Sequence, residues 1–132
     1  MLLALLLLGL LTFSPVETRE AVLTIYVCQV DTNNPEMHGG FCPEGPRTYA
    51  SVKVQPGVAA CSWDLPMGTI FSIEEDPTGG VYQCLDRGLL GAGNPTHVDV
   101  WCMTTSSERC GLPWLAQVGP RPRLTIILPE GS

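Results

Sequence analysis

Two aspartates lie in sequence contexts that are suited to acid–base chemistry. Asp86, in the stretch QCLDRG, ends a strand-like run before a glycine, and Asp99, in HVDVWC, lies inside a run of alternating side chains. Strand interiors disfavour aspartate, so an acid flanked by valines there is unusual. A carboxylic acid whose pKa is raised by burial or by a second carboxylate can act as a general acid and base. The alternative is that Asp99 lies on the exposed face of a half-buried sheet.

The alternation around Asp99 predicts which side chains share its face. On a strand through this stretch, Val98 and Val100 point to one side, and His97, Asp99 and Trp101 point to the other. His97 could then bond a substrate hydroxyl, or it could be a surface histidine at the end of a strand.

Short strands are the elements expected to position these side chains. The chain contains 12 Pro and 14 Gly, which cut helices short. The runs between them are rich in Val, Ile, Thr and Tyr, as is typical of strands. We predict strands at Val22–Gln29, Thr48–Val54, Thr69–Glu75, Gly80–Leu85, His97–Cys102 and Arg123–Leu128, and helical turns at Thr105–Cys110 and Pro113–Gln117. Six short strands with irregular links predict a small closed β-barrel in an all-β domain.

The start of the chain predicts export. An apolar run of about ten residues begins at Leu2, and this length suits a signal peptide better than a membrane span. The alternative is a hydrophobic strand or a buried helix. We expect residues 1–20 to be a signal peptide with an approximate boundary, and residues 21–132 to form one secreted, periplasmic or cell-envelope domain. No stable membrane span is expected after cleavage, and a monomer is expected.

The cysteines and the charge limit the classes of ligand. All six cysteines follow the leader (Cys28, Cys42, Cys61, Cys84, Cys102 and Cys110), and an even number in a short exported chain favours disulfides over metal binding. No C-x-x-C occurs, so we expect no zinc, no other metal and no cofactor. The net charge of −6, with seven scattered Lys and Arg, argues against nucleic acid as a partner because no basic patch is available.

The order of several stretches resembles the 3D domain, a double-psi β-barrel named for three aspartates. This domain occurs in the lytic transglycosylase A family and in secreted cell-wall proteins related to resuscitation factors. The stretches that carry the resemblance are LTIYVCQ (Leu23–Gln29), VAACSWDLPMGT (Val58–Thr69), LDRGLLGAG (Leu85–Gly93), HVDVWC (His97–Cys102) and LTIIL (Leu124–Leu128). The resemblance implies a small six-stranded double-psi β-barrel with one or two short helices, stabilised by disulfides.

The resemblance also assigns roles to single residues. The second family aspartate falls on Asp86, and the third, which is the catalytic acid/base of the transglycosylase branch, falls on Asp99. The first falls on Cys61, so this carboxylate is missing. Cys84 precedes Asp86 by two residues and is expected on the same strand face, which makes it a sensible partner for Cys61. Cys102 would then pair with Cys110, and Cys28 with Cys42.

The activity implied by the resemblance is cleavage of the β-1,4 bond between N-acetylmuramic acid and N-acetylglucosamine in peptidoglycan. One aspartate can suffice, because the muramic acid 6-hydroxyl closes a 1,6-anhydro ring, whereas an ordinary glycosidase usually needs two carboxylates. We expect Asp99 as acid/base with Asp86 beside it, and Tyr26, Thr69 and Trp101 against the substrate. Tyr26 could instead be a core tyrosine.

A different class of function stays open. The missing first aspartate and the many cysteines favour a non-catalytic double-psi barrel that binds cell-wall glycan or a protein. Barrels of this broad shape also occur in rare lipoprotein A, in expansins and in barwin-like plant proteins. An inhibitor or structural protein is a third possibility. An enzyme requires Asp86 and Asp99 to converge in one groove that no disulfide fills. Trp63, just before the Pro66–Thr69 turn, could stack on sugar or pack at the barrel rim.

Overall fold

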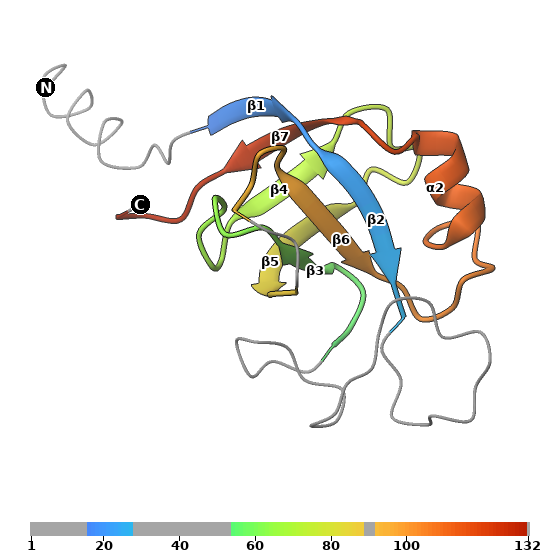
Figure 1. Ribbon diagram of the computed structural model, residues 1–132. Helices are drawn as coiled ribbons and strands as arrows, with labels where there is room; N and C mark the ends of the chain where they lie inside the picture. Colours follow the sequence, from blue (N-terminus) through green and yellow to red (C-terminus); the bar gives the residue numbers. More distant parts are fainter. Residues whose placement is uncertain (1–15, 28–53, 89–91, 132) are drawn as a thin grey trace, which may run out of the picture.

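The structure is a computed structural model, which describes residues 16–27, 54–88 and 92–131. These residues form one sheet of seven strands and one helix (Figure 1). The elements are β1 (Val16–Glu20), β2 (Val22–Tyr26), β3 (Val58–Cys61), β4 (Ile70–Ile73), β5 (Val81–Asp86), β6 (His97–Trp101), α2 (Leu112–Val118) and β7 (Arg123–Ile127). The mostly-β prediction is confirmed, but the strand number of six was wrong. In the described part of the chain, no helix is long and apolar enough to cross a membrane.

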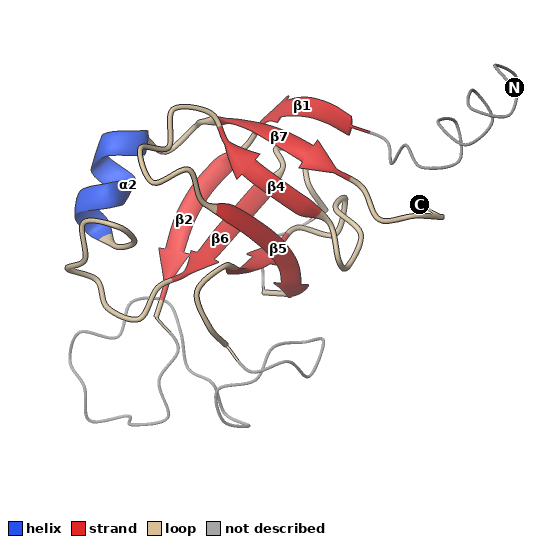
Figure 2. Ribbon diagram, turned by 180° about the vertical axis from the view of Figure 1, so that it is seen from behind, coloured by secondary structure: helices blue, strands red, loops and turns tan. Residues whose placement is uncertain are grey.

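The sheet is strongly curled and mixes parallel and antiparallel pairs. The strand order is β1-β7-β4-β5-β3-β6-β2. β2 runs parallel to β6 and β3 runs parallel to β5, whereas the other pairs are antiparallel. The expected closure was wrong, because β1 and β2 are both edges and do not pair with each other. These two edges are nevertheless consecutive in the chain and are separated by Ala21 alone, so the curled sheet brings its ends to one bend (Figures 1 and 2).

Five of the predicted strands are present with shifted ends, as β2, β4, β5, β6 and β7. The strand predicted at Thr48–Val54 lies outside the described residues except for Val54, which is not in a strand. β3 was not predicted as a strand. It lies between two neighbours with all four residues buried, so its sequence VAAC shows no alternation, and alanine is a poor strand former.

The helical turn predicted at Thr105–Cys110 was wrong. Ser106 instead forms an isolated bridge with Gly111, and the Cys102–Cys110 disulfide, with 5.5 Å between the Cα atoms, folds the segment back on itself. A loop that returns to its start over so few residues leaves little length for a helix. The second predicted helix is present as α2, where Pro113 occupies the first turn, a position that tolerates a missing N–H.

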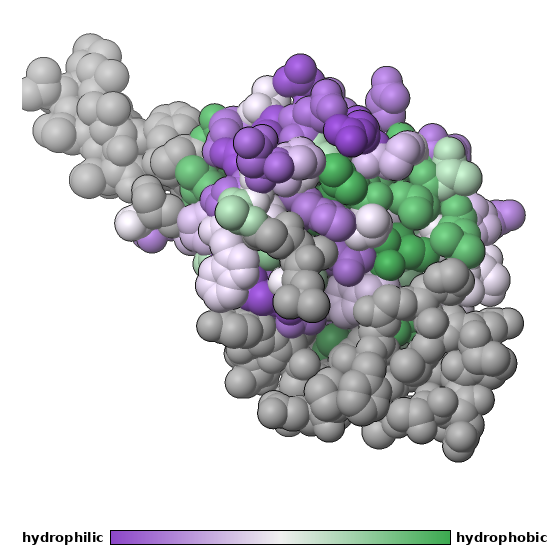
Figure 3. Space-filling view, viewed as in Figure 1, coloured by the Kyte–Doolittle hydropathy of each residue, from purple (hydrophilic) through white to green (hydrophobic). Residues whose placement is uncertain are grey.

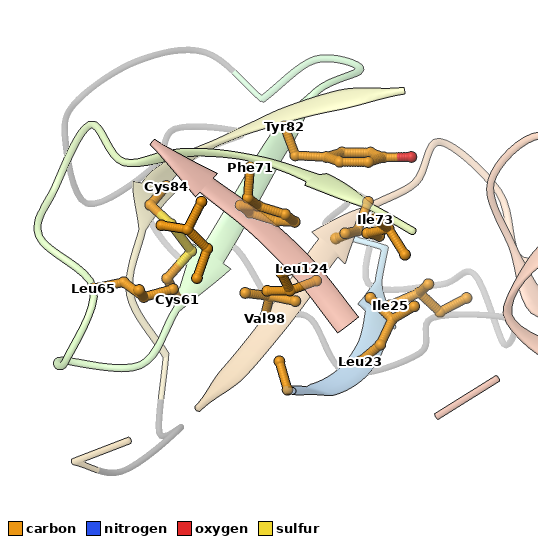
Figure 4. Packing of buried hydrophobic residues seen from close by; sticks show 14 of the residues in the cluster. Leu23, Ile25, Cys61, Leu65, Phe71, Ile73, Tyr82, Cys84, Val98 and Leu124 are labelled. Carbon is orange, nitrogen blue, oxygen red and sulfur yellow. A yellow bond between two sulfur atoms is a disulfide. The ribbon is translucent and has the colours of Figure 1, made fainter. Parts of the chain in front are cut away.

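The core lies inside the curl of the sheet and includes a disulfide. Cys61 and Cys84 are fully buried and bonded, with 5.6 Å between their Cα atoms, and Figure 4 shows the bond beside Leu65 and Phe71. This pairing and the Cys102–Cys110 pairing confirm two of the predicted disulfides, whereas Cys28 and Cys42 lie outside the described residues. The two disulfides are typical of proteins that fold in oxidising compartments.

Helix α2 is attached to the sheet through a buried tryptophan. The Trp114 ring is fully buried, and its Nε1 donates a 3.0 Å hydrogen bond to Asp76 Oδ1. The Tyr82 hydroxyl donates to the other oxygen of Asp76 at 2.9 Å, and the backbone N–H of Thr78 donates to Oδ1 at 2.9 Å. Burial raises the pKa of Asp76, but the hydrogen bonds from Trp114, Thr78 and Tyr82 outweigh it and hold that pKa below its ordinary value.

Replacing Asp76 with Ala is expected to lower the free energy of unfolding by about 1–3 kcal/mol, because the buried donors of Trp114 and Tyr82 lose their acceptor. The pKa of Asp76 is lower in the folded chain, so its contribution is present above the unfolded pKa and is lost as pH falls through the folded pKa. Urea unfolding between pH 2 and 7 measures both effects. Asp76→Asn should flatten the acid side of the profile, and Glu74→Gln, at an exposed neighbour, should leave it unchanged.

Strand β1 covers residues that the predicted leader includes. Arg19 donates through Nη1 to Asp64 Oδ2 at 2.8 Å, and through Nη2 to Glu17 Oε1 at 2.8 Å. The sequence of β1 is largely polar, and hydrophilic residues gather over this strand in Figure 3. Hydrophobic residues gather over the adjoining β2 and α2. Residues 1–15 lie outside the described part of the chain, and the signal-peptide boundary stays a prediction. A chain cut after Glu20 would lack this strand.

Candidate functional site

The register of three neighbouring strands places the two aspartates on one face. Ala60, on the central strand β3, lies opposite Asp99 on β6 and opposite Asp86 on β5. On β6 the flanking residues Val98 and Val100 are fully buried in the core, so Asp99 points to the outer side of the sheet. Ala60, which has a small side chain, is therefore the residue that separates the two acids across the three strands.

A register shift between β3 and β5 brings Asp86 to this face. Ala59 pairs with Cys84, and the next pair is Ala60 with Asp86, so one residue of β5 is skipped. Two residues then oppose one, which is the pattern of a β-bulge, and bulges re-aim side chains. The prediction that Cys84 and Asp86 share a face was therefore wrong, because Cys84 lies in the core while Asp86 reaches Tyr26 on the outer side.

Two of the groups that bind Asp86 belong to described residues. The Tyr26 hydroxyl donates to Oδ2 at 2.9 Å, and the backbone N–H of Arg87 donates to Oδ1 at 2.9 Å. Burial, followed by the negative charge of Asp86, raises the pKa of Tyr26. The phenol therefore stays protonated and remains a hydrogen-bond donor across the physiological range.

Asp99 is partly buried, and its pKa is raised to about 6. Burial is the main cause and the charge of Asp86 adds to it, while a hydrogen bond from Thr24 opposes them. Thr24 Oγ1 donates to Asp99 Oδ1 at 2.8 Å and lies 2.7 Å from His97 Nε2. Because the hydroxyl has one proton, His97 must carry its own proton on Nε2 when Thr24 donates to the carboxylate. Burial lowers the pKa of His97, which favours the neutral imidazole with its one proton on Nε2.

The other predicted binding residues have different surroundings. Trp101 lies on the same outer face and packs with Tyr26, Val58 and Ala60, with 8% of its surface exposed. The Thr69 hydroxyl is buried in its turn and donates to the carbonyl of Pro66 at 2.7 Å. The structure therefore brings together Asp86, Asp99, Tyr26 and Trp101, but it does not bring the Thr69 hydroxyl to the acids.

Arg87 organises the loop beside the acids and was not predicted. Its guanidinium donates to the carbonyls of Cys61, Ser62 and Leu65 at 3.0, 2.8 and 2.7 Å. It also lies 4.8 Å from the centre of the Trp63 ring, as in a cation–π contact. The signal available in the sequence was its position directly after Asp86, but carbonyl contacts of an arginine cannot be inferred from spacing.

Asp64 belongs to a separate cluster at the start of β6. It accepts hydrogen bonds from Arg19, from Ser62 and, at 2.6 Å, from Thr96 Oγ1. Gly93 lies against it, and a Cβ at that position would collide with the Asp64 side chain. Asp64 therefore has a structural role in this cluster.

Replacing Asp86 with Asn is expected to lower the pKa of Asp99, because a nearby negative charge disappears. The pKa of Asp99 is higher in the folded chain than in the unfolded one, so its ionisation opposes folding. Stability from this group is therefore full below about pH 4 and falls as pH rises through about 6. A carbon-13 NMR titration of the Asp99 carboxyl measures the first effect. An unchanged midpoint in Asp86→Asn would contradict the coupling.

Neither a metal site in the described part of the chain nor a match to a known protein identifies the chemistry of this site. Among the described residues, no three His, Cys, Asp or Glu side chains gather in a group able to hold a metal ion. No protein-family model, curated protein or solved structure matches the chain.

Proposed function

We propose that this protein is an exported lytic transglycosylase that cleaves the β-1,4 bond between N-acetylmuramic acid and N-acetylglucosamine in peptidoglycan. The observation that carries the proposal is the pair of Asp86 and Asp99 on one outer face, with the pKa of Asp99 raised to about 6. A general acid with a pKa near neutral pH is protonated often enough to donate and basic enough to accept. The ordered resemblance to the 3D domain supplies the substrate class.

In the proposed mechanism Asp99 acts twice. The neutral carboxyl donates its proton to the glycosidic oxygen, and the bond from that oxygen to the muramic acid C1 breaks. The Asp99 carboxylate then accepts the proton of the muramic acid 6-hydroxyl, whose oxygen bonds to C1 and closes the 1,6-anhydro ring. Asp99 is regenerated as an acid, and no water is consumed. Thr24, which donates to Asp99 at 2.8 Å, orients the carboxyl and stabilises its ionised form.

Asp86 and Tyr26 support this acid. The negative charge of Asp86 raises the pKa of Asp99 and stabilises positive charge that develops at the sugar C1. Tyr26 holds Asp86 at 2.9 Å and keeps it oriented. The Cys61–Cys84 bond lies in the core on the other side of the sheet, so it does not fill the space between the two acids.

The double-psi topology and the compartment belong to the same proposal. The two parallel pairs, β2 with β6 and β3 with β5, support a double-psi arrangement because each requires a crossover connection. The junction of both sheet edges at Ala21 supports a barrel-like shape. The two disulfides support secretion or a periplasmic location.

A second candidate is a non-catalytic barrel that binds cell-wall glycan. It is favoured by Cys61, which replaces the first aspartate of the resemblance and is buried in a disulfide. Co-sedimentation with purified peptidoglycan, followed by the turbidity of the suspension, separates the candidates. The enzyme binds and clears the suspension, whereas the binding protein co-sediments without clearing it. A protein that neither binds nor clears would rule out both candidates for this substrate.

A further inference from the structure

A groove begins where β6 ends, next to the carboxylate face. Its volume is about 510 Å³, within the range of sites that take a small ligand or a few residues of peptide. The residues of its wall come from three places. Trp101 belongs to β6, Val81 belongs to β5, and Met103, Ser107 and Arg109 belong to the segment that the Cys102–Cys110 disulfide closes. The disulfide fixes this third wall relative to the sheet.

The wall presents one positive charge and a strip of apolar surface. Among the described residues that line the groove, Arg109 alone is charged, and no hydrogen bond or ion pair within the described ranges occupies its guanidinium. Its neighbour Glu108 does not line the groove, but both residues line an adjacent hollow. Met103 and Val81 are exposed by 66% and 62%. This combination suits an anionic ligand with small apolar groups.

The indole N–H of Trp101 is a donor without an acceptor in the part of the chain that the structure describes. The ring is more than nine-tenths buried, and its Nε1 has no hydrogen-bond partner within the described residues. An unpaired buried N–H is unfavourable, and an acceptor on a ligand would relieve the penalty. A peptide carbonyl is such an acceptor.

Trp101 lines the groove and lies near the two acids, which do not themselves line it. Trp101 follows Asp99 by two residues on the same strand face, and it lies in register with Tyr26, whose hydroxyl binds Asp86. A ligand in the groove would therefore extend from a substrate held at the two acids. In peptidoglycan, a short peptide that contains carboxylates and alanine methyl groups is attached to the muramic acid. The muramic acid is the sugar whose C1 reacts in the proposed mechanism.

We propose that this groove binds the stem peptide of peptidoglycan. In this arrangement Arg109 pairs with a peptide carboxylate, Met103 and Val81 contact alanine methyl groups, and the Trp101 indole donates to a peptide carbonyl. The inference rests on the proposed function for the identity of the ligand. It adds that the enzyme distinguishes glycan that carries peptide from bare glycan.

The test is a titration of the oxidised protein with the synthetic tetrapeptide L-Ala-γ-D-Glu-L-Lys-D-Ala, followed by NMR at the Trp101 indole N–H. The peptide should shift that resonance. Arg109→Gln should weaken binding about tenfold, because a charge-assisted hydrogen bond is lost. Arg121→Gln, which changes an exposed arginine outside the groove, is the matched control and should bind like wild type. Trp101→Phe should weaken binding about threefold.

An unshifted indole resonance, or equal affinity in wild type and Arg109→Gln, would overturn the inference. The binding test requires no catalysis, so it is separable from the proposed function. Peptide binding without glycan cleavage would keep the groove assignment and refute the transglycosylase. Cleavage of peptidoglycan and of amidase-stripped glycan with the same KM would keep the transglycosylase and refute the peptide site.

Discussion

Asp99→Asn is expected to reduce the release of soluble anhydromuropeptides by about 100- to 10,000-fold, which is the usual contribution of a general acid–base residue. Asparagine keeps the size of the side chain and can still accept the Thr24 hydrogen bond, but it has no proton to give to the glycosidic oxygen. The loss should appear in kcat, with KM little changed, because the proton is transferred only in the transition state. Chromatography of products with time measures the rate.

The control for this variant is a carboxylate that lies away from the site. Glu74→Gln removes an exposed negative charge outside the groove and should keep wild-type activity. Asp99→Asn should also be at least as stable as wild type near neutral pH, because the buried charge is gone. An Asp99→Asn variant that is folded and fully active would remove Asp99 from the mechanism.

Replacing both Cys61 and Cys84 with alanine is expected to lower the free energy of unfolding by about 2–5 kcal/mol. The bond closes a sequence separation of 23, against 8 for Cys102–Cys110, so it restricts the unfolded chain more. Both sulfurs are also buried in the core, and their loss leaves space there. Urea unfolding of the double variant gives the change in stability.

The Cys102→Ala/Cys110→Ala double variant is the matched comparison. It should lose about 1 kcal/mol less in the chain-entropy model, because its loop is shorter. The Cys61/Cys84 variant that remains folded should keep its activity, since the bond lies across the sheet from the two acids. Equal stability of this variant and wild type would contradict the structural role assigned to the bond.

The strands that could be predicted are those with one face buried. β2 and β6 show clean alternation, so their positions and the outward direction of Asp99 follow from the sequence. β3 has four buried residues and no alternation, and β1 has the polar sequence VETRE inside a range assigned to the leader. Their existence depends on pairing with distant strands, which local patterns do not report.

The candidate site could be predicted in outline but not in its contacts. The sequence singled out Asp86 and Asp99 as a pair, and the structure pairs both with Ala60 and bonds Tyr26 to Asp86. The register shift in β5 reversed the expected relation between Cys84 and Asp86, because one skipped residue moves every later side chain to the other face. The bonds from Thr24 and Arg87 depend on the same long-range register.

The measurement that tests the central claim most directly is mass spectrometry of the products of peptidoglycan digestion in water labelled with heavy oxygen. If Asp99 acts as proposed, wild type releases muropeptides with 1,6-anhydro ends that contain no label, and Asp99→Asn releases none above background. Labelled reducing ends would show attack by water and would contradict the transglycosylase. No soluble product from the folded wild type would contradict glycan cleavage altogether.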